Sequence, residues 1–187
     1  MEEVLTFEDA AQWEAWLAGH HEKVDGIWMK IGKKGSAKKS ITAPEAGDVA
    51  LCYGWIDSVR RSFDGDYFLQ KYSRRRPNGS WSEVNVDRVE SLMAAGRMRA
   101  GGLAEVSAAK ADGRWAAAYA SQKNAMIPPD VRAALQANKP AKDSYDQLGK
   151  TDRYLMILPV LKARTPEARA ARLQKMIDRL APPGDRR

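Results

Sequence analysis

The sequence predicts an α+β fold: a small antiparallel sheet with a central hairpin at about residues 55–72, packed by helices and followed by a C-terminal helical segment. Two runs with period-two alternation flank the dipeptide Asp64-Gly65, which is typical of a hairpin turn. The segments around the hairpin instead carry apolar residues at helical spacing. The chain has 187 residues, and a chain of this size buries about 70% of its unfolded surface, so a substantial core is expected.

The first elements are a helix and a strand. Thr6, followed by acidic residues, predicts a capped helix over residues 7–19, in which Trp13 and Leu17 belong to the apolar stripe. Residues 27–31 then read as a strand, because apolar and other side chains alternate after an Asp-Gly turn.

A second helix is predicted from its start and stop signals. Thr42 and Glu45 have the spacing of a capping box, and Gly54 supplies a stop. Cys52 falls in the last turn of this helix. A lone cysteine among apolar residues is typical of a small buried hydrophobe, and a nucleophilic role would require a neighbouring base that the local sequence does not provide.

The first arm of the hairpin mixes apolar and charged residues. Strict alternation places the following five residues on one face: Trp55, Asp57, Val59, Arg61 and Phe63. A carboxylate on such a face needs a cation or several donors. Arg60, Arg61 and the run Arg74-Arg75-Arg76 are nearby candidates, so both a structural ion pair and a catalytic carboxylate at Asp57 stay open.

The arginine run precedes a predicted helix start. Ser80 and Glu83 are spaced as a capping box, and guanidinium groups next to a helix N-terminus favour an anion site. Trp81 could add a stacking surface and Asn85 a hydrogen-bond partner. A solvated loop is the alternative interpretation of the same residues.

The rest of the chain is predicted to be helical. Asp130 is a candidate cap for a short helix, a helix beginning at Thr151 contains Pro159, and Thr165-Pro166 opens the last helix. We therefore predict an α+β core over residues 1–115, a connection containing Ala and Pro over 116–140, and a C-terminal helical segment over 141–187.

Composition narrows the classes of function. The 31 Lys and Arg against 24 Asp and Glu give a net charge of +7, which favours anionic partners, either a small anion or nucleic acid. One cysteine excludes an internal disulfide and a metal site built from several thiolates. We find no glycine-rich phosphate loop, dinucleotide fingerprint, zinc-protease motif or serine elbow, so no cofactor and no metal are expected.

Location is inferred from what the sequence lacks. No apolar run approaches the roughly 18 residues of a membrane span, and the acidic N-terminus is unlike a secretory signal. We expect a cytoplasmic protein with no membrane span. The sequence does not indicate the oligomeric state.

Several ordered motifs resemble a known family. They are residues 52–57 (Cys-Tyr-Gly-Trp-Ile-Asp), residues 67–76, residues 81–85 (Trp-Ser-Glu-Val-Asn) and residues 96–98. With the C-terminal segment, the chain from about residue 5 to residue 180 resembles the YdeI/OmpD-associated family, also called bacteriocin-protection proteins. Pro159 and Ser144-Tyr145 depart from the aromatic residues that relatives tend to carry. The resemblance implies a role in stress tolerance and brings no established reaction, cofactor or catalytic residue.

Three hypotheses about function follow. The first is a non-enzymatic binder of a small anionic or aromatic ligand, with these binding residues: Trp55, Asp57, Arg60, Arg74, Arg75, Trp81 and Asn85. The second is an enzyme with Asp57 as acid or base and arginines that stabilise charge. The third is a nucleic-acid-binding protein that uses the positive charge and exposed aromatic residues.

Overall fold

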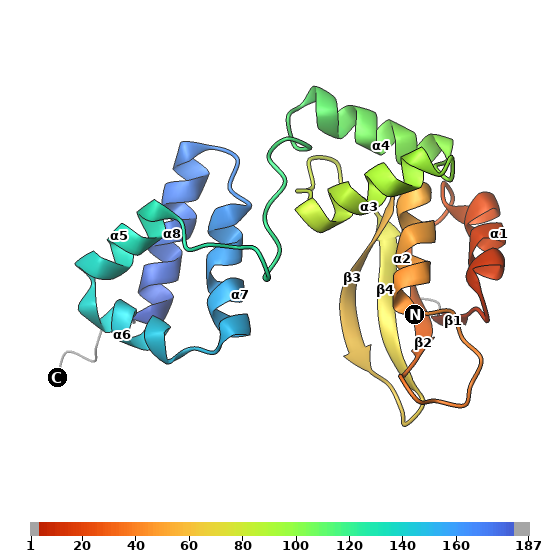
Figure 1. The fold of residues 1–187 in the computed structure, drawn as a ribbon, viewed down its shortest axis with the longest axis horizontal. Helices are drawn as coiled ribbons and strands as arrows, with labels where there is room; N and C mark the ends of the chain where they lie inside the picture. The colour runs from red at the N-terminus through yellow and green to blue at the C-terminus, as the bar shows by residue number, and fades with distance from the viewer. Residues whose placement is uncertain (1–3, 182–187) are drawn as a thin grey trace. The chain divides into compact units, whose positions relative to one another are not determined.

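The fold is α+β, as the sequence predicts. A computed structural model describes residues 4–181, which contain eight helices and four strands (Figure 1). The chain forms two compact units: residues 1–79 with 85–116, and residues 80–84 with 117–187. The last six residues of the predicted C-terminal segment lie outside the described part.

The first unit contains a four-stranded sheet. Its strands are β1 (Val4–Thr6), β2 (Gly26–Gly32), β3 (Trp55–Ser62) and β4 (Tyr67–Arg74), arranged in the order β1-β2-β4-β3. The pairs β2/β4 and β3/β4 are antiparallel, but β1 is parallel to β2, so the sheet is mixed and not wholly antiparallel. β1 was not predicted, because a strand of three residues is too short to show a period of two.

The central hairpin forms where it was predicted. In its turn, the Asp64 carboxylate accepts hydrogen bonds from the backbone N–H groups of Asp66 (2.9 Å) and Tyr67 (2.7 Å). This side chain replaces backbone partners in the way typical of Asp in turns. The turn therefore fixes the register of β3 on β4.

A β-bulge corrects the predicted faces of β3. The register shifts between Asp57 and Arg60, so that Asp57 pairs with Tyr72 whereas Arg61 pairs with Leu69. Tyr72 and Leu69 are three residues apart and therefore point to opposite faces of β4. The prediction that Asp57 and Arg61 share one face is wrong, because one extra residue in β3 reverses the alternation.

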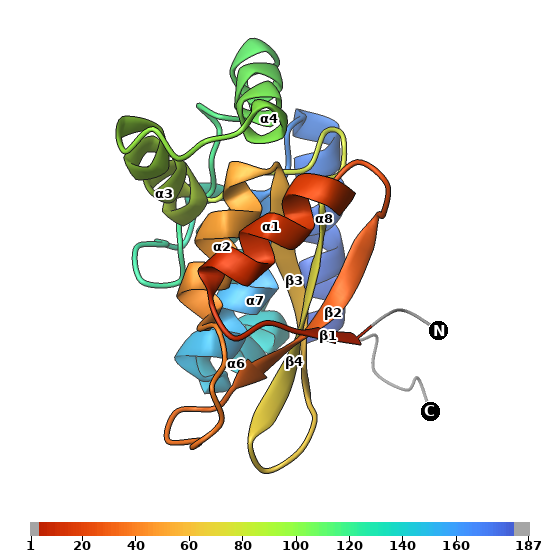
Figure 2. The same cartoon turned by 90° about the vertical axis from the view of Figure 1, so that its right-hand side faces the viewer.

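Two helices, α1 (Ala10–His20) and α2 (Ala43–Cys52), lie side by side against the sheet (Figures 1 and 2). The predicted capping box of α2 is confirmed: Thr42 and Glu45 bond to each other's backbone N–H. The N-cap of α1 is Asp9 and not Thr6, because Thr6 is used as the last residue of β1.

Aromatic residues hold these layers together. Trp13 of α1 is fully buried, and its ring lies 6.1 Å from the ring of Trp55 and 5.7 Å from that of Tyr72. Both buried indoles have acceptors: Trp13 Nε1 donates to the Ala46 carbonyl (3.1 Å) and Trp55 Nε1 to the His21 carbonyl (3.2 Å). The core therefore joins both helices to the hairpin.

Two further helices, α3 (Glu83–Ala94) and α4 (Ala100–Ala111), follow the hairpin. The start of α4 packs closely on the end of α2, where Arg99 N–H donates to the Cys52 carbonyl (3.0 Å). Gly102 makes this approach possible, since a Cβ there would lie 2.3 Å from the same carbonyl oxygen. Gly54 has φ +76°, which favours glycine, and ends the α2 region.

The C-terminal unit is helical. Its helices are α5 (Pro129–Ala137), α6 (Lys139–Gln147), α7 (Lys150–Leu161) and α8 (Pro166–Leu180), and α8 packs on the other three. Their apolar stripes form a separate core that includes Val131, Leu135, Tyr145, Ile157 and Ile177. No helix of residues 4–181 combines the length and the apolar character that crossing a membrane requires.

Asp130 has a different role from the one predicted. It lies inside the first turn of α5, whose N-cap is Pro128, so it does not cap the helix. Its carboxylate instead pairs with Arg169 of α8 through two hydrogen bonds of 2.6 and 2.9 Å. These bonds hold the pKa of the Asp130 carboxyl below its ordinary value.

We expect Gly102→Ala to destabilise the protein by about 1–3 kcal/mol, because the added methyl overpacks the contact between α2 and α4. Gly19→Ala is the matched control, since nothing lies within 4 Å of a Cβ at that position. Urea unfolding of both variants checks the expectation. Equal stability of the two variants would contradict the proposed contact.

The ion pair between Asp130 and Arg169 predicts a pH effect. Because the folded-state pKa of Asp130 is depressed, its contribution to stability is fully present above the unfolded-state pKa of about 3.9 and is lost as the pH falls through the lower folded-state value. Both side chains are about one-third exposed (34% and 38%), so solvent screening limits the contribution to about 1 kcal/mol or less. We expect Asp130→Asn to lower the free energy of unfolding at pH 7 and to flatten its decline in acid, as measured by urea unfolding at several pH values.

Candidate functional site

The arginine run extends from the end of β4 and is fixed by its backbone. Arg74 N–H donates to the Asp25 carbonyl (3.1 Å), and Arg75 N–H donates to the Gly54 carbonyl (3.0 Å). A turn follows in which Gly79 N–H donates to the Arg76 carbonyl (2.9 Å) and Asn78 has φ 62°. The sheet and the end of α2 therefore position the three arginines.

These arginines line an open groove of about 670 Å³. The other residues that line it are Asp25, Gly26, Lys71, Ser73, Pro77 and Glu105. Four of the nine are basic and two are acidic, which leaves a net formal charge of +2 in the lining. We call this the arginine groove. It can attract an anion and bind it with planar, bidentate guanidinium groups.

The three arginines are not equivalent. The Arg74 guanidinium donates hydrogen bonds to the carbonyl groups of Glu22 and Val24 and lies 3.9 Å from the Asp25 carboxylate. These contacts hold its side chain in the wall of the groove. Arg75 is buried, with 9% of its surface exposed, whereas Arg76 is exposed. A cation in a partly desolvated position interacts more strongly with an anion than an exposed one does. Arg75 is therefore the strongest candidate for direct recognition.

Lys71 and Glu105 belong to the groove but were not predicted. The position of Lys71 is explained by the alternation of side chains along β4, which places Lys71 on the same face as Ser73. Glu105 comes from α4, some thirty residues further along the chain, and reaches the groove because α4 packs on the end of α2. No local pattern could have shown this.

Three predicted site residues lie on β3 and outside the groove lining. Trp55 pairs with Arg74 across the hairpin, but its ring is buried in the core. Asp57 is exposed opposite Tyr72, and burial together with the Asp57 charge raises the pKa of the Tyr72 phenol. Arg60 donates to the Gln70 side chain (3.0 Å) and lies over the Phe68 ring.

The other two predicted residues flank the start of α3. This helix begins at Glu83, so Ser80 does not act as its N-cap; residues 81–83 instead pair in a short bridge with Tyr119. Trp81 is buried and belongs to the C-terminal unit, while Asn85 is half-buried and belongs to the first. Convergence of all seven predicted residues on one ligand stays a prediction.

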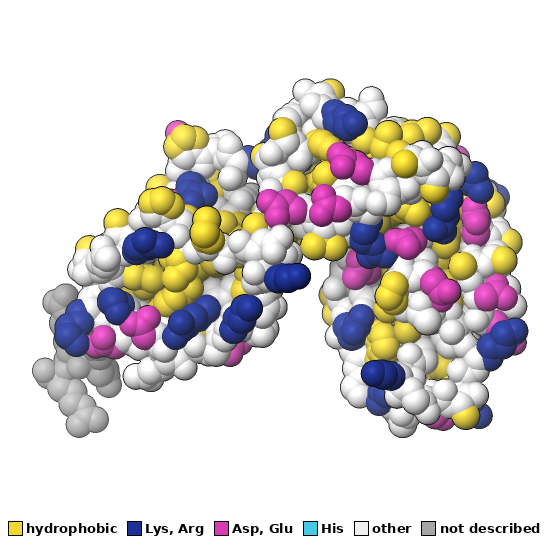
Figure 3. All heavy atoms as spheres, in the orientation of Figure 1, with side chains coloured by type: hydrophobic (Ala, Val, Ile, Leu, Met, Phe, Trp, Pro, Cys, Tyr) yellow, Lys and Arg dark blue, Asp and Glu magenta, His cyan; other side chains and the backbone are white. Residues whose placement is uncertain are grey.

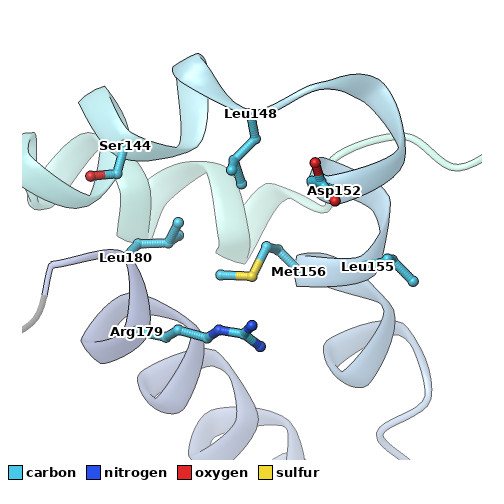
Figure 4. Close-up of a pocket in the computed structure, with 7 residues that line it drawn as sticks. All are labelled: Ser144, Leu148, Asp152, Leu155, Met156, Arg179 and Leu180. Carbon is cyan, nitrogen blue, oxygen red and sulfur yellow. The ribbon is translucent and has the colours of Figure 1, made fainter.

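The C-terminal unit has hollows of its own. Apolar surface gathers over it, bordered by Lys and Arg side chains (Figure 3). One hollow of about 400 Å³ lies between α6, α7 and α8, where Leu148, Met156 and Leu180 point toward one another (Figure 4). Asp152 and Arg179 also line it, so its one acidic and one basic side chain balance in charge.

Groups for metal or thiol chemistry do not assemble in the described part of the chain. Within residues 4–181, no three His, Cys, Asp or Glu side chains gather as a set that could hold a metal ion. Cys52 is buried, and burial raises the pKa of its thiol. A thiol with a raised pKa is a poor nucleophile, so Cys52 has the structural character predicted for it.

Comparison with known families divides the chain. Residues 5–105 match the model of a domain of unknown function, DUF8412, and residues 124–182 match the model described as bacteriocin-protection, YdeI or OmpD-associated (OmdA). Searches of curated proteins and of solved structures give no significant match. The predicted family resemblance is confirmed on the C-terminal segment, whereas the region with most of the motifs quoted for it matches the model of unknown function. The chain therefore belongs to the DUF8412 family and carries an OmdA domain of the bacteriocin-protection, YdeI or OmpD-associated type in residues 124–182.

Proposed function

We propose that this protein is a non-enzymatic, cytoplasmic binder of a small anionic ligand that acts in stress tolerance of the bacteriocin-protection type. The arginine groove is the observation that carries the proposal, because it gathers Lys71 and three arginines in one opening with a net positive lining. The OmdA domain supports the link to bacteriocin protection, since its family description names that role.

The groove suits an anion with more than one charged oxygen. Arg75 offers a guanidinium with little exposure to water, and Arg76 and Lys71 add charges at the more open part. Bidentate hydrogen bonds from arginine match the oxygens of a phosphate or carboxylate. Acidic Asp25 and Glu105 limit the total charge, which favours a small anion over a long polyanion.

The enzyme hypothesis has less support. Asp57 lies outside the lining of the arginine groove, so the carboxylate of this hypothesis is not among the groups that line the groove with the cations. Asp57 as a catalytic acid or base stays a prediction.

A nucleic-acid-binding function is a second candidate, supported by one face of the sheet. There the Arg61 guanidinium lies 4.6 Å from the centre of the Trp28 ring, and the Lys71 ammonium lies 5.8 Å from the same ring. The Lys30 ammonium lies 4.6 Å from the ring of Phe63, which is 47% exposed. Cations for phosphates and an exposed ring for base stacking, here that of Phe63, are the combination that binds single strands.

The anion proposal is tested by titrating pyrophosphate into the full chain in a calorimeter. We expect Arg75→Gln to weaken binding tenfold or more, because it removes charge-assisted hydrogen bonds worth about 1.5–3 kcal/mol. Arg76→Gln should weaken it about two- to fivefold, as expected for an exposed charge. Arg132→Gln makes the same change of net charge on an exposed residue of α5 and should leave binding unchanged. The proposal is contradicted if the wild type does not bind pyrophosphate, or if Arg76→Gln and Arg132→Gln lose equal amounts of affinity.

The nucleic-acid candidate is tested with a single-stranded DNA oligonucleotide at several salt concentrations. We expect log K to fall with log salt at a slope of about −0.7 per phosphate contacted. Phe63→Ala should cost about 1–3 kcal/mol of binding by loss of stacking. Val59→Ala is the control, because Val59 lies in β3 four residues before Phe63 and is similarly exposed (46%). Fluorescence anisotropy measures both effects, and absence of binding at low salt removes this candidate.

A further inference from the structure

A cavity of about 510 Å³ lies within the C-terminal unit, between α7, the end of α6 and residues 122–127. Its volume is in the range of small-molecule sites, which is about 300–1,000 Å³. Four aliphatic side chains and two aromatic rings form its walls: Ala125, Ile127, Leu148, Ile157, Tyr145 and Tyr154. The cavity can therefore hold the apolar body of a ligand.

The charge of this cavity has one sign. Lys150 and Arg153 are the basic residues that line it, and among the described residues of its lining none is acidic. Burial raises the pKa of both tyrosine phenols, so they stay neutral and add no negative charge. An anionic group is the complement of this lining.

Arg153 gives the strongest indication of a ligand. Its guanidinium lies 5.6 Å from the centre of the Tyr145 ring, and its Nη2 donates to the Asp146 carbonyl. Its Nε is buried and has no hydrogen-bond partner among the described residues. A buried donor without an acceptor costs free energy. An oxygen of a bound anion would supply that acceptor.

We propose that this cavity is a binding site for a small aromatic carboxylate, with the ring between Tyr145, Tyr154 and the aliphatic wall and the carboxylate on Arg153 and Lys150. Every residue of the lining except Gln122 lies in the OmdA domain, and all of them belong to the C-terminal unit. It is therefore distinct from the arginine groove, and either site can be tested without the other.

The hollow of Figure 4 is an internal control. It shares Leu148 with this cavity and is also lined by aliphatic side chains, but its lining contains both the basic Arg179 and the acidic Asp152. An anion gains little from a lining whose charges already balance. Charge, and not apolar surface alone, should therefore decide where the carboxylate binds.

The experiment titrates 2-naphthoate into the full chain by calorimetry, with the neutral 2-naphthylmethanol in parallel. We expect Arg153→Gln to raise the dissociation constant about tenfold or more, since it removes a charge-assisted bond. Lys150→Gln, on an exposed residue, should raise it about two- to fivefold. Arg179→Gln should leave it unchanged, and the alcohol should bind at least about tenfold more weakly than the carboxylate.

Methyl NMR of the wild type tests the location without any variant. On addition of 2-naphthoate, the methyl signals of Ile127 and Ile157 should shift, and those of Leu155 and Ile56 should not. Arg153→Gln removes the bond to the Asp146 carbonyl, so if that variant does not fold, Lys150→Gln and the methyl shifts decide. The proposal is overturned if 2-naphthoate does not bind at millimolar concentration, if Arg179→Gln weakens binding as much as Lys150→Gln, or if other methyl groups shift instead. Since Arg75 and Arg76 are not in this lining, a negative result with pyrophosphate leaves this test unaffected.

Discussion

Burial of Trp13 is the constraint on which the first unit depends. One indole contacts the rings of Phe7, Trp55 and Tyr72 and donates its N–H to a carbonyl of α2. It thereby couples a helix, a second helix and both strands of the hairpin. Aromatic side chains bury large areas and prefer tilted or edge-to-face contacts, which makes such a cluster both stabilising and specific in geometry. Trp55 also pairs directly with Arg74, so the cluster is linked to the place where β4 ends and the arginine run begins.

The two units use different means to expose positive charge. In the first, a sheet strand carries arginines to a place where α4 adds Glu105, and the groove is open and polar. In the second, four helices around a separate apolar core leave a cavity whose wall is aliphatic and aromatic and whose basic groups lie on one helix, α7. The family comparison divides the chain in the same region, with one match ending at residue 105 and the other beginning at residue 124. The basic residues behind the net charge of +7 therefore do not all lie on open surface, because some of them line the arginine groove and the cavity of the C-terminal unit.

Signals confined to a few neighbouring residues predicted the fold well. The Thr42 capping box, the hairpin at Asp64-Gly65 and the α8 start at Thr165-Pro166 all depend on contacts within four residues, and all are present. The predictions that were wrong concern residues whose partners lie far away in the sequence or compete with the predicted local contact. Asp130 pairs with Arg169, thirty-nine residues away, and the stretch after Ser80 pairs with Tyr119 before its helix can begin. The bulge in β3 reversed the faces because alternation alone does not reveal an inserted residue. The groove was anticipated through Arg74 and Arg75, but its other walls come from elements that only tertiary packing brings together.

The close approach of α4 to α2 has a practical consequence for chemical labelling. The last turn of α2 holds the single cysteine of the chain, and the Gly102 contact lies against the carbonyl of that residue. A maleimide reagent needs an accessible thiolate. Cys52 is a poor target for it, because the side chain is buried and burial raises the pKa of its thiol. A cysteine introduced at an exposed position of either unit can therefore carry a fluorophore or spin label while the native thiol is left in place. Distances between such labels would then report how the two units are arranged in solution.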